Sequence, residues 1–184
     1  MMVAPGLQAA LHLARGRPEA VLLVGGGEEG MPAARRSFWA AAICTPAFVG
    51  LHLLEHRGVG GPGLRALAVD LLGFAIGWIG FALASHRVAG MLGRAVLWPR
   101  FITLWNWCNL LQYLMLTAAA LLGLAGLPDW IGQTAWLIAL GWAMWLEWFM
   151  TRVSLALSGA VAVAMVALDV AIGLVVAGVV ASPG

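Results

Sequence analysis

The sequence predicts an all-α integral membrane protein, in which five transmembrane helices form one bundle behind a short amphipathic N-terminal arm. Three observations favour this fold class. Of the 184 residues, 62% are hydrophobic and 10% are charged, whereas soluble domains are roughly 45–50% apolar and about 25% charged. The apolar residues gather in segments near the length that a membrane-crossing helix needs, about 20 residues. If the segments cross the membrane in alternating directions, most of the arginines between them fall on one side of it.

The same composition excludes several other classes of protein. A soluble domain of this size cannot hide so much apolar surface from water. We therefore expect no soluble enzyme, disulfide scaffold or nucleic-acid binder. The partner that the composition predicts is the lipid bilayer. Cys44 and Cys108 both fall inside apolar segments, so we interpret them as small buried hydrophobes. No cofactor motif is present, and we predict no cofactor.

Residues 1–37 are predicted to form a cytoplasmic arm. Four apolar residues recur with the i, i+3, i+4, i+7 spacing of a helix face: Leu7, Ala10, Leu11 and Ala14. This spacing predicts an amphipathic helix over 6–15, lying on the cytoplasmic leaflet. A flexible glycine-rich loop is expected at 25–30.

Residues 38–181 are predicted to form the transmembrane domain. The five spans are expected at about 38–54, 64–85, 101–125, 130–150 and 153–181. The first span is short and contains Pro46, whose freed backbone group Thr45 or a neighbouring helix can satisfy. The last span is longer than the bilayer requires, so it should tilt or project.

The arginines set the expected topology. If five spans alternate, eight arginines fall on one side: Arg15, Arg17, Arg35, Arg36, Arg87, Arg94, Arg100 and Arg152. Only Arg57 and Arg65 fall on the other side. The positive-inside rule then places the N-terminus in the cytoplasm and the C-terminus outside. The abundance of Ala and Gly and the absence of Lys are typical of a high-GC bacterial genome, which indicates a bacterial inner membrane.

Three carboxylates lie within the predicted spans, where each costs about 2.5–3.5 kcal/mol at a helix centre. Asp70 has Arg65 five residues away, and Glu147 has Arg152 just beyond it. Pairing with these arginines explains both as structural features, and they are secondary site candidates. Asp169 lies near the middle of the last span with no basic residue nearby in the sequence.

The third span carries the expected partners of Asp169. Asn106, Asn109 and Tyr113 share one helical face, and Gln112 lies beside them. Since such side chains hydrogen-bond well across helices, we predict an intramembrane cluster of Asp169, Asn109 and Gln112, with Asn106 nearby. The cluster is either a structural clamp between helices or a proton or ion site.

The stretch His52-Leu-Leu-Glu55-His56 closes the first span. H-x-x-E-H is the spelling of one class of metalloprotease, in which two histidines bind zinc and the glutamate acts as base. The alternative is a polar helix end in the headgroup layer. His52, Glu55 and His56 are therefore weak metal candidates.

Small residues mark expected helix contacts. Gly73 and Gly77 form a G-x-x-x-G pattern, and Gly80 follows on the same helix. In an apolar helix this pattern lets two backbones approach closely. It supports compact packing within one bundle or self-association into a homo-oligomer.

The general plan resembles the Yip1-like membrane proteins, including small bacterial members. The resemblance rests on Arg15-Gly-Arg-Pro-Glu19, Arg36-Ser-Phe38, and Phe101-Ile with Asn106-Trp107. It implies a five-span fold with a cytoplasmic N-terminal arm. The Asp-Leu-x-Gly-Pro motif of the eukaryotic members is absent, so no functional residue is carried over.

Three functions follow from these observations. The first is a non-enzymatic scaffold or assembly partner of other membrane subunits, because no nucleotide or convincing catalytic motif is present. The second is a small transporter or channel subunit with Asp169 as the proton- or cation-coupling group. The third is a membrane metalloenzyme that uses His52, Glu55 and His56.

Overall fold

A computed structural model describes residues 4–55, 63–125 and 128–181, and these residues are all-α without a strand. The all-α prediction is confirmed. The elements, in order, are α1 (Ala4–Leu13), the 3₁₀ turn η1 (Pro18–Leu23), α2 (Gly27–Ser37), α3 (Trp39–Glu55), α4 (Leu64–Met91), the 3₁₀ turn η2 (Ala95–Leu97), α5 (Trp98–Gly123), α6 (Asp129–Ser154) and α7 (Gly159–Ala181).

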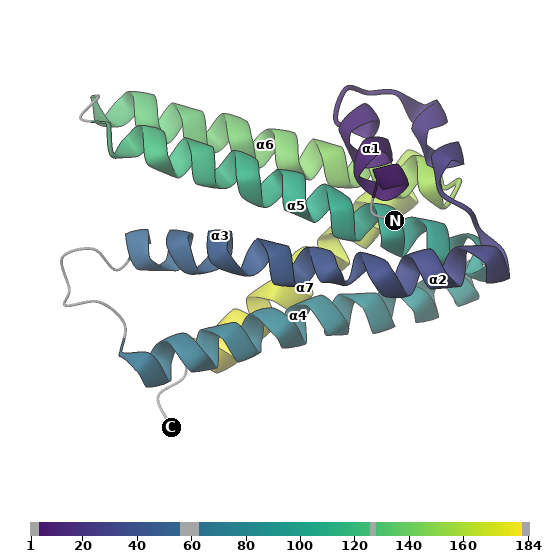
Figure 1. Cartoon of the computed structure of the whole chain (residues 1–184), viewed down its shortest axis with the longest axis horizontal. Helices are drawn as coiled ribbons and strands as arrows, with labels where there is room; N and C mark the ends of the chain where they lie inside the picture. Colours follow the sequence, from purple (N-terminus) through teal and green to yellow (C-terminus); the bar gives the residue numbers. More distant parts are fainter. Residues whose placement is uncertain (1–3, 56–62, 126–127, 182–184) are drawn as a thin grey trace.

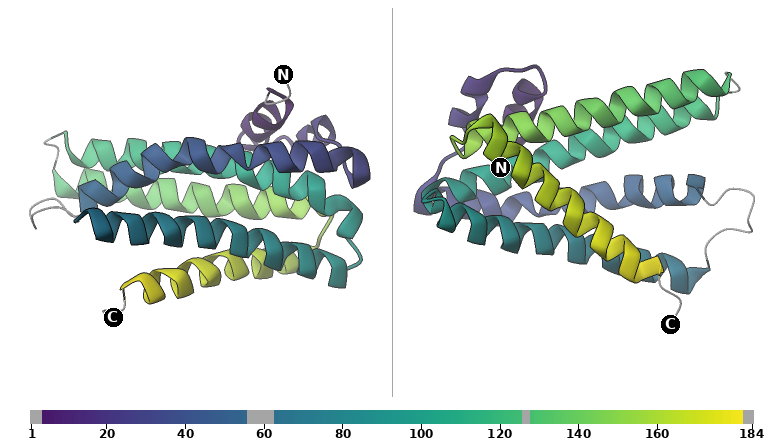
Figure 2. Two further views of the ribbon diagram at one scale, coloured as in Figure 1. Left: turned by 60° about the horizontal axis from the view of Figure 1, so that its bottom comes forward. Right: turned by 180° about the vertical axis from the view of Figure 1, so that it is seen from behind.

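The long helices run back and forth along one common direction (Figure 1). α2 and α3 follow each other as one nearly continuous rod, and α4, α5 and α6 alternate in direction beside it. α7 leaves the end of α6 and crosses the bundle obliquely to reach the beginning of α4 (Figure 2). The arm with α1 lies at the end of the bundle where α2 begins.

Three helical stretches in the described chain are long and apolar enough to cross a membrane: Gly27–Leu54, Leu64–Met91 and Gly159–Ala181. This finding supports a membrane protein. α5 and α6 contain 26 residues each, but polar side chains lower their average hydropathy. Three of these, Asn106, Gln112 and Glu147, are buried inside the bundle.

The predicted start of the last span is wrong. α6 continues through Ser154, and a turn over 155–158 separates it from α7. Within this turn Ala156 adopts a positive φ of 51°, and the Leu157 amide donates to the Arg152 carbonyl at 3.0 Å. α7 therefore contains 23 residues, close to the bilayer length, so no excess length forces it to tilt.

The arm folds differently from the prediction. α1 forms, but its apolar face of Ala9, Ala10 and Leu13 is fully buried and packs on α5 and α6. It is therefore covered by protein, and a leaflet is not needed to cover it. Gly6 lies so close to α5 that an added Cβ would approach Trp107 Cδ1 to 2.5 Å.

The glycine-rich loop expected at 25–30 is also wrong in part, because α2 already begins at Gly27. An added Cβ on Gly30 would lie 2.5 Å from the Gly25 carbonyl oxygen, so only glycine fits this first turn. The Arg100 Nε donates to the Val24 carbonyl at 2.9 Å. This bond fixes the segment before α2 to the start of α5.

The predicted packing role of the α4 glycines is confirmed at Gly73 and Gly80 but not at Gly77. A Cβ on Gly73 would lie 2.8 Å from Val180 Cγ2, and one on Gly80 would lie 3.5 Å from Ile172 Cγ2, so both glycines face α7. Gly77, between them, has nothing within 4 Å of its Cβ position. The interface between α4 and α7 is thus closely packed at Gly73 and Gly80 and loosely packed at Gly77.

We predict that Gly6→Val releases the arm from the bundle. The added methyl groups would overlap Trp107, which is 3% exposed, and overpacking of this kind costs about 1–3 kcal/mol. Trypsin should then cleave after the exposed Arg15 at least about fivefold faster than in the unmodified protein. Gly141→Val is the control, because Gly141 is exposed on α6 with open space at its Cβ. Equal cleavage rates in the two variants would contradict the docked arm.

Candidate functional site

α5 carries the side chains that tie the bundle together. The Asn106 amide is completely buried; its Oδ1 accepts from Trp78 Nε1 at 2.6 Å, and its Nδ2 donates to Ser37 Oγ at 2.7 Å. One turn and a half later, Gln112 Nε2 donates to the Ala143 carbonyl at 3.0 Å. These bonds join α5 to α4, α2 and α6, so both amides are structural clamps.

The predicted cluster around Asp169 is therefore only partly present. The Asp169 Oδ2 accepts from the Trp105 indole Nε1 at 3.1 Å. Asn109 lines the same cavity as Asp169, although its Nδ2 donates to the Trp105 carbonyl at 3.0 Å. Gln112 and Asn106 face other helices, because the 100° step of a helix turns them away from α7.

Glu147 is the partner of Asp169 that the sequence analysis missed. The two carboxyl groups, one on α6 and one on α7, lie close enough to interact. The predicted pairing of Glu147 with Arg152 is wrong, since the Arg152 guanidinium lies over the Trp148 ring, 5.6 Å from its centroid. Two adjacent carboxylates repel each other, which favours a proton on one of them, and the protonated carboxyl can then donate to the other.

Glu147 is also well enclosed. It is 7% exposed, and its Oε1 finds no hydrogen-bond partner among the described residues. A buried carboxyl oxygen without a donor is costly unless the group is neutral or a ligand supplies the donor. In the Asp169–Glu147 pair, Glu147 Oε1 can therefore still accept a hydrogen bond.

Asp70 lies at a second polar point, on α4. Its Oδ2 is 3.0 Å from His52 Nε2 on α3, so the predicted pairing with Arg65 is wrong. The pair joins two helices that have few other contacts near this end.

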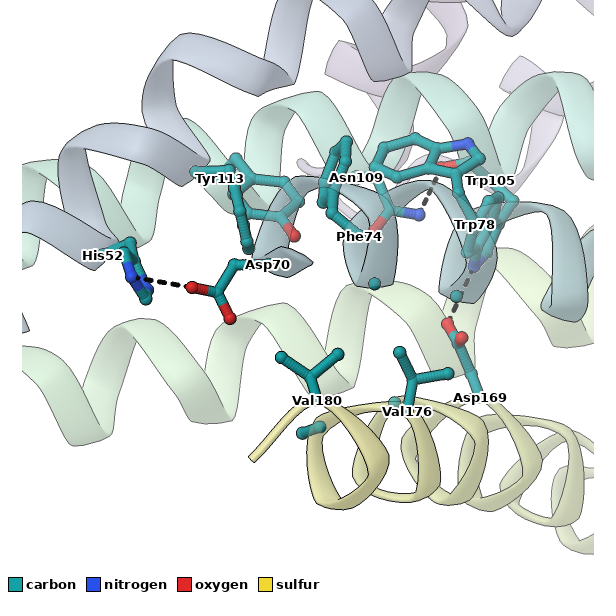
Figure 3. Close-up of a pocket in the computed structure, with 15 residues that line it drawn as sticks. His52, Asp70, Phe74, Trp78, Trp105, Asn109, Tyr113, Asp169, Val176 and Val180 are labelled. Atoms are coloured by element: carbon teal, nitrogen blue, oxygen red, sulfur yellow. Dashed lines mark hydrogen bonds and ion pairs between the residues drawn. The ribbon is translucent and has the colours of Figure 1, made fainter. Parts of the chain in front are cut away.

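One cavity connects the two polar points (Figure 3). Its volume is about 380 Å³, and it lies between α3, α4, α5 and α7. The His52–Asp70 pair is at one end and Asp169 with Trp105 is at the other, with Asn109 and Tyr113 between them. The cavity thus places a carboxyl of the Asp169–Glu147 pair where a ligand can reach it.

Aromatic rings form one wall of this cavity. Phe74 packs on Phe48 with centroids 4.7 Å apart and on Trp78 at 5.2 Å. Trp78 then contacts Trp105 edge to face at 5.2 Å and stacks with Tyr113 at 6.4 Å. The opposite wall is small and aliphatic, since α7 supplies Gly173, Val176, Ala177 and Val180.

The metal hypothesis concerns residues at the edge of the described chain. His52 is engaged by Asp70, whereas the Glu55 side chain and His56 lie outside the described residues. Within the part of the chain that the structure describes, no three His, Cys, Asp or Glu residues gather as a metal site. Cys44 and Cys108 are buried and not bonded to each other, as predicted.

Comparisons with known proteins found no match among family models, curated proteins or solved structures. The resemblance to Yip1-like proteins therefore stays a prediction. The site has to be interpreted from its own chemistry.

We predict that Asn106→Leu lowers the free energy of unfolding by about 1–3 kcal/mol, because it leaves the buried Trp78 indole N–H without its acceptor. Asn109→Leu is the matched control. Its amide bonds only to a carbonyl of its own helix, so the loss should be smaller. The measurement is reversible unfolding by sodium dodecyl sulfate in mixed micelles. Equal losses in the two variants would show that Asn106 is not a clamp.

Proposed function

We propose that the protein is a small transporter or channel subunit that uses Asp169 as its proton- or cation-coupling group. One observation carries the proposal: Asp169, with a second carboxyl, that of Glu147, close beside it, lines a cavity between α3, α4, α5 and α7. Intramembrane carboxyls that face a cavity are typical of ion and proton pathways.

The chemistry of coupling follows from the pair. A cation that approaches Asp169 from the cavity competes with the proton held between Asp169 and Glu147, because two adjacent carboxylates repel each other when both are charged. Binding of the cation favours release of the proton, and return of the proton favours release of the cation. The other titratable groups that face this cavity are His52 on α3, Asp70 on α4 and Tyr113 on α5.

The scaffold hypothesis takes second place for a structural reason. A clamp between helices is the role it assigned to Asp169, and the carboxyl does join α7 to α5 through Trp105, but Asp169 also lines the cavity. Asp169 is left with an exposed edge on the cavity. A scaffold makes no use of this cavity, whereas a transporter requires one.

Five spans in a bacterial inner membrane are part of the proposal. α5 and α6 run beside α3 and α4 and contain 26 residues each, within the range of 23 to 28 residues of the three apolar stretches (Figure 1). Asn106, Gln112 and Glu147 are buried, and most of the large side chains that α5 and α6 expose are apolar, among them Leu114, Leu121, Leu137 and Ile138. Their outer surface therefore suits hydrocarbon, although their mean hydropathy does not show it.

The arginines support a cytoplasmic N-terminus. α2, the end of α4, the start of α5 and the end of α6 all lie at the end of the bundle that carries the arm. These segments hold Arg35, Arg36, Arg87, Arg100 and Arg152. The opposite end, where α4 begins, carries Arg65, so the positive-inside rule places the arm in the cytoplasm.

The connection between α5 and α6 tests the number of spans. We predict that a cysteine at the exposed Leu124 reacts with a membrane-impermeant maleimide added to intact spheroplasts, as a cysteine at Leu64 does. A cysteine at Met91 should react only after permeabilisation, because α4 ends on the cytoplasmic side. If Leu124→Cys behaves like Met91→Cys, then α5 and α6 do not cross the bilayer and the five-span topology is wrong.

Proton coupling is tested in proteoliposomes that contain a pH-sensitive dye. We predict that an inward gradient of at least one probe cation (sodium, potassium, ethidium or tetraphenylphosphonium) drives proton efflux. Asp169→Asn should reduce this flux at least about tenfold, because an amide cannot release a proton. Asp129→Asn is the control, since Asp129 is exposed at the start of α6. Flux no greater than in protein-free vesicles, or full flux in Asp169→Asn, would overturn the proposal.

A further inference from the structure

We propose that the cavity binds a lipophilic organic monocation, such as a quaternary ammonium or phosphonium compound that carries aryl or alkyl groups. This inference names the substrate class of the proposed transporter, and it rests on the proposed function only for the transport step. Binding itself follows from the size, the walls and the charge of the cavity.

The size of the cavity indicates an organic molecule. Sites for small molecules commonly occupy about 300–1,000 Å³ and are mostly apolar, with a few convergent polar groups. The cavity here is about 380 Å³. A metal ion would fill a small part of it, and the described residues offer no cluster of three metal-binding side chains.

The aromatic wall favours a positive charge. The faces of tryptophan and tyrosine rings attract cations within about 6 Å of the ring centroid, and desolvation strengthens this attraction. Trp78, Trp105 and Tyr113 border the cavity together, and Asp169 lies beside Trp105 (Figure 3). A cation placed near Asp169 thus meets a carboxylate with tryptophan and tyrosine rings close by.

The charge balance indicates a single positive charge. No arginine lines the cavity among the described residues, and His52 is already paired with Asp70. Repulsion between two adjacent carboxylates favours one proton on the Asp169–Glu147 pair, so one negative charge faces a ligand. An anionic ligand would meet this carboxylate without a basic side chain to offset it.

The remaining wall accommodates apolar substituents. Gly77 on α4 and Gly173 on α7 both line the cavity, and neither has an atom within 4 Å of its Cβ position. Val176 and Val180 continue this surface along α7. Aryl or alkyl groups of a cation can therefore lie against α7 while the charged centre lies near Asp169.

The test measures binding of radiolabelled tetraphenylphosphonium to the purified full-length protein in detergent, with tetraphenylborate as the competitor of the same shape and opposite charge. We expect saturable binding that unlabelled tetraphenylphosphonium displaces and tetraphenylborate does not. Asp169→Asn should weaken the affinity at least about tenfold. Gly77→Leu should abolish binding by filling the cavity, whereas Gly141→Leu, on the exposed face of α6, should leave it unchanged.

The outcomes separate this inference from the proposed function. Binding that shows this pattern, without cation-driven proton flux, supports the substrate class and overturns the transporter. Flux driven by sodium or potassium, with no saturable tetraphenylphosphonium binding, supports the transporter and overturns the substrate class. Equal affinity in Gly77→Leu and Gly141→Leu, or equal competition by tetraphenylborate, would also overturn the organic-cation site. Circular dichroism and monodispersity of each variant show that loss of binding is not loss of the fold.

Discussion

Polar side chains inside an apolar bundle have to satisfy one another, and α5 is where this constraint is met. Trp105, Asn106 and Gln112 reach α7, α2 with α4, and α6, respectively. An unpaired polar group in such surroundings costs several kcal/mol, so these bonds fix how α5 is rotated about its axis. That rotation also determines which of its residues border the cavity. The rotation of α5 about its axis therefore determines both the hydrogen bonds between helices and the lining of the cavity.

Much of the fold was predictable because membrane helices are encoded by length and hydropathy. The positions of the apolar segments, the buried cysteines and the packing role of Gly73 follow from local sequence alone. The start of α7 was not predictable in this way, since Val153, Leu155 and Leu157 continue the apolar pattern through the junction and the turn at Ala156 has no strong sequence signal. The docking of α1 was missed for a similar reason: an apolar helix face looks the same whether protein or lipid covers it.

The candidate site was less predictable than the fold. Asp169 and Asn109 were found because each is a polar residue at depth within an apolar segment. Glu147 was assigned to Arg152 by closeness in sequence, and Asp70 to Arg65 on the same ground. In both cases the true partner lies on another helix, at a distance that only the packing decides. The aromatic wall was missed because tryptophan and phenylalanine are so frequent that none stands out before the helices are placed.

The polar side chains of α5 have a consequence for the order in which the bundle assembles. Synthesis delivers the helices from the N-terminus onward, and both hydrogen-bond partners of Asn106 belong to helices that emerge before α5. Its amide is satisfied as soon as α5 inserts beside them. The partners of Gln112 and Trp105 emerge later, on α6 and α7. Helices α2 to α4 thus form a template on which α5 packs, and the polar core is complete only when α7 has packed as well.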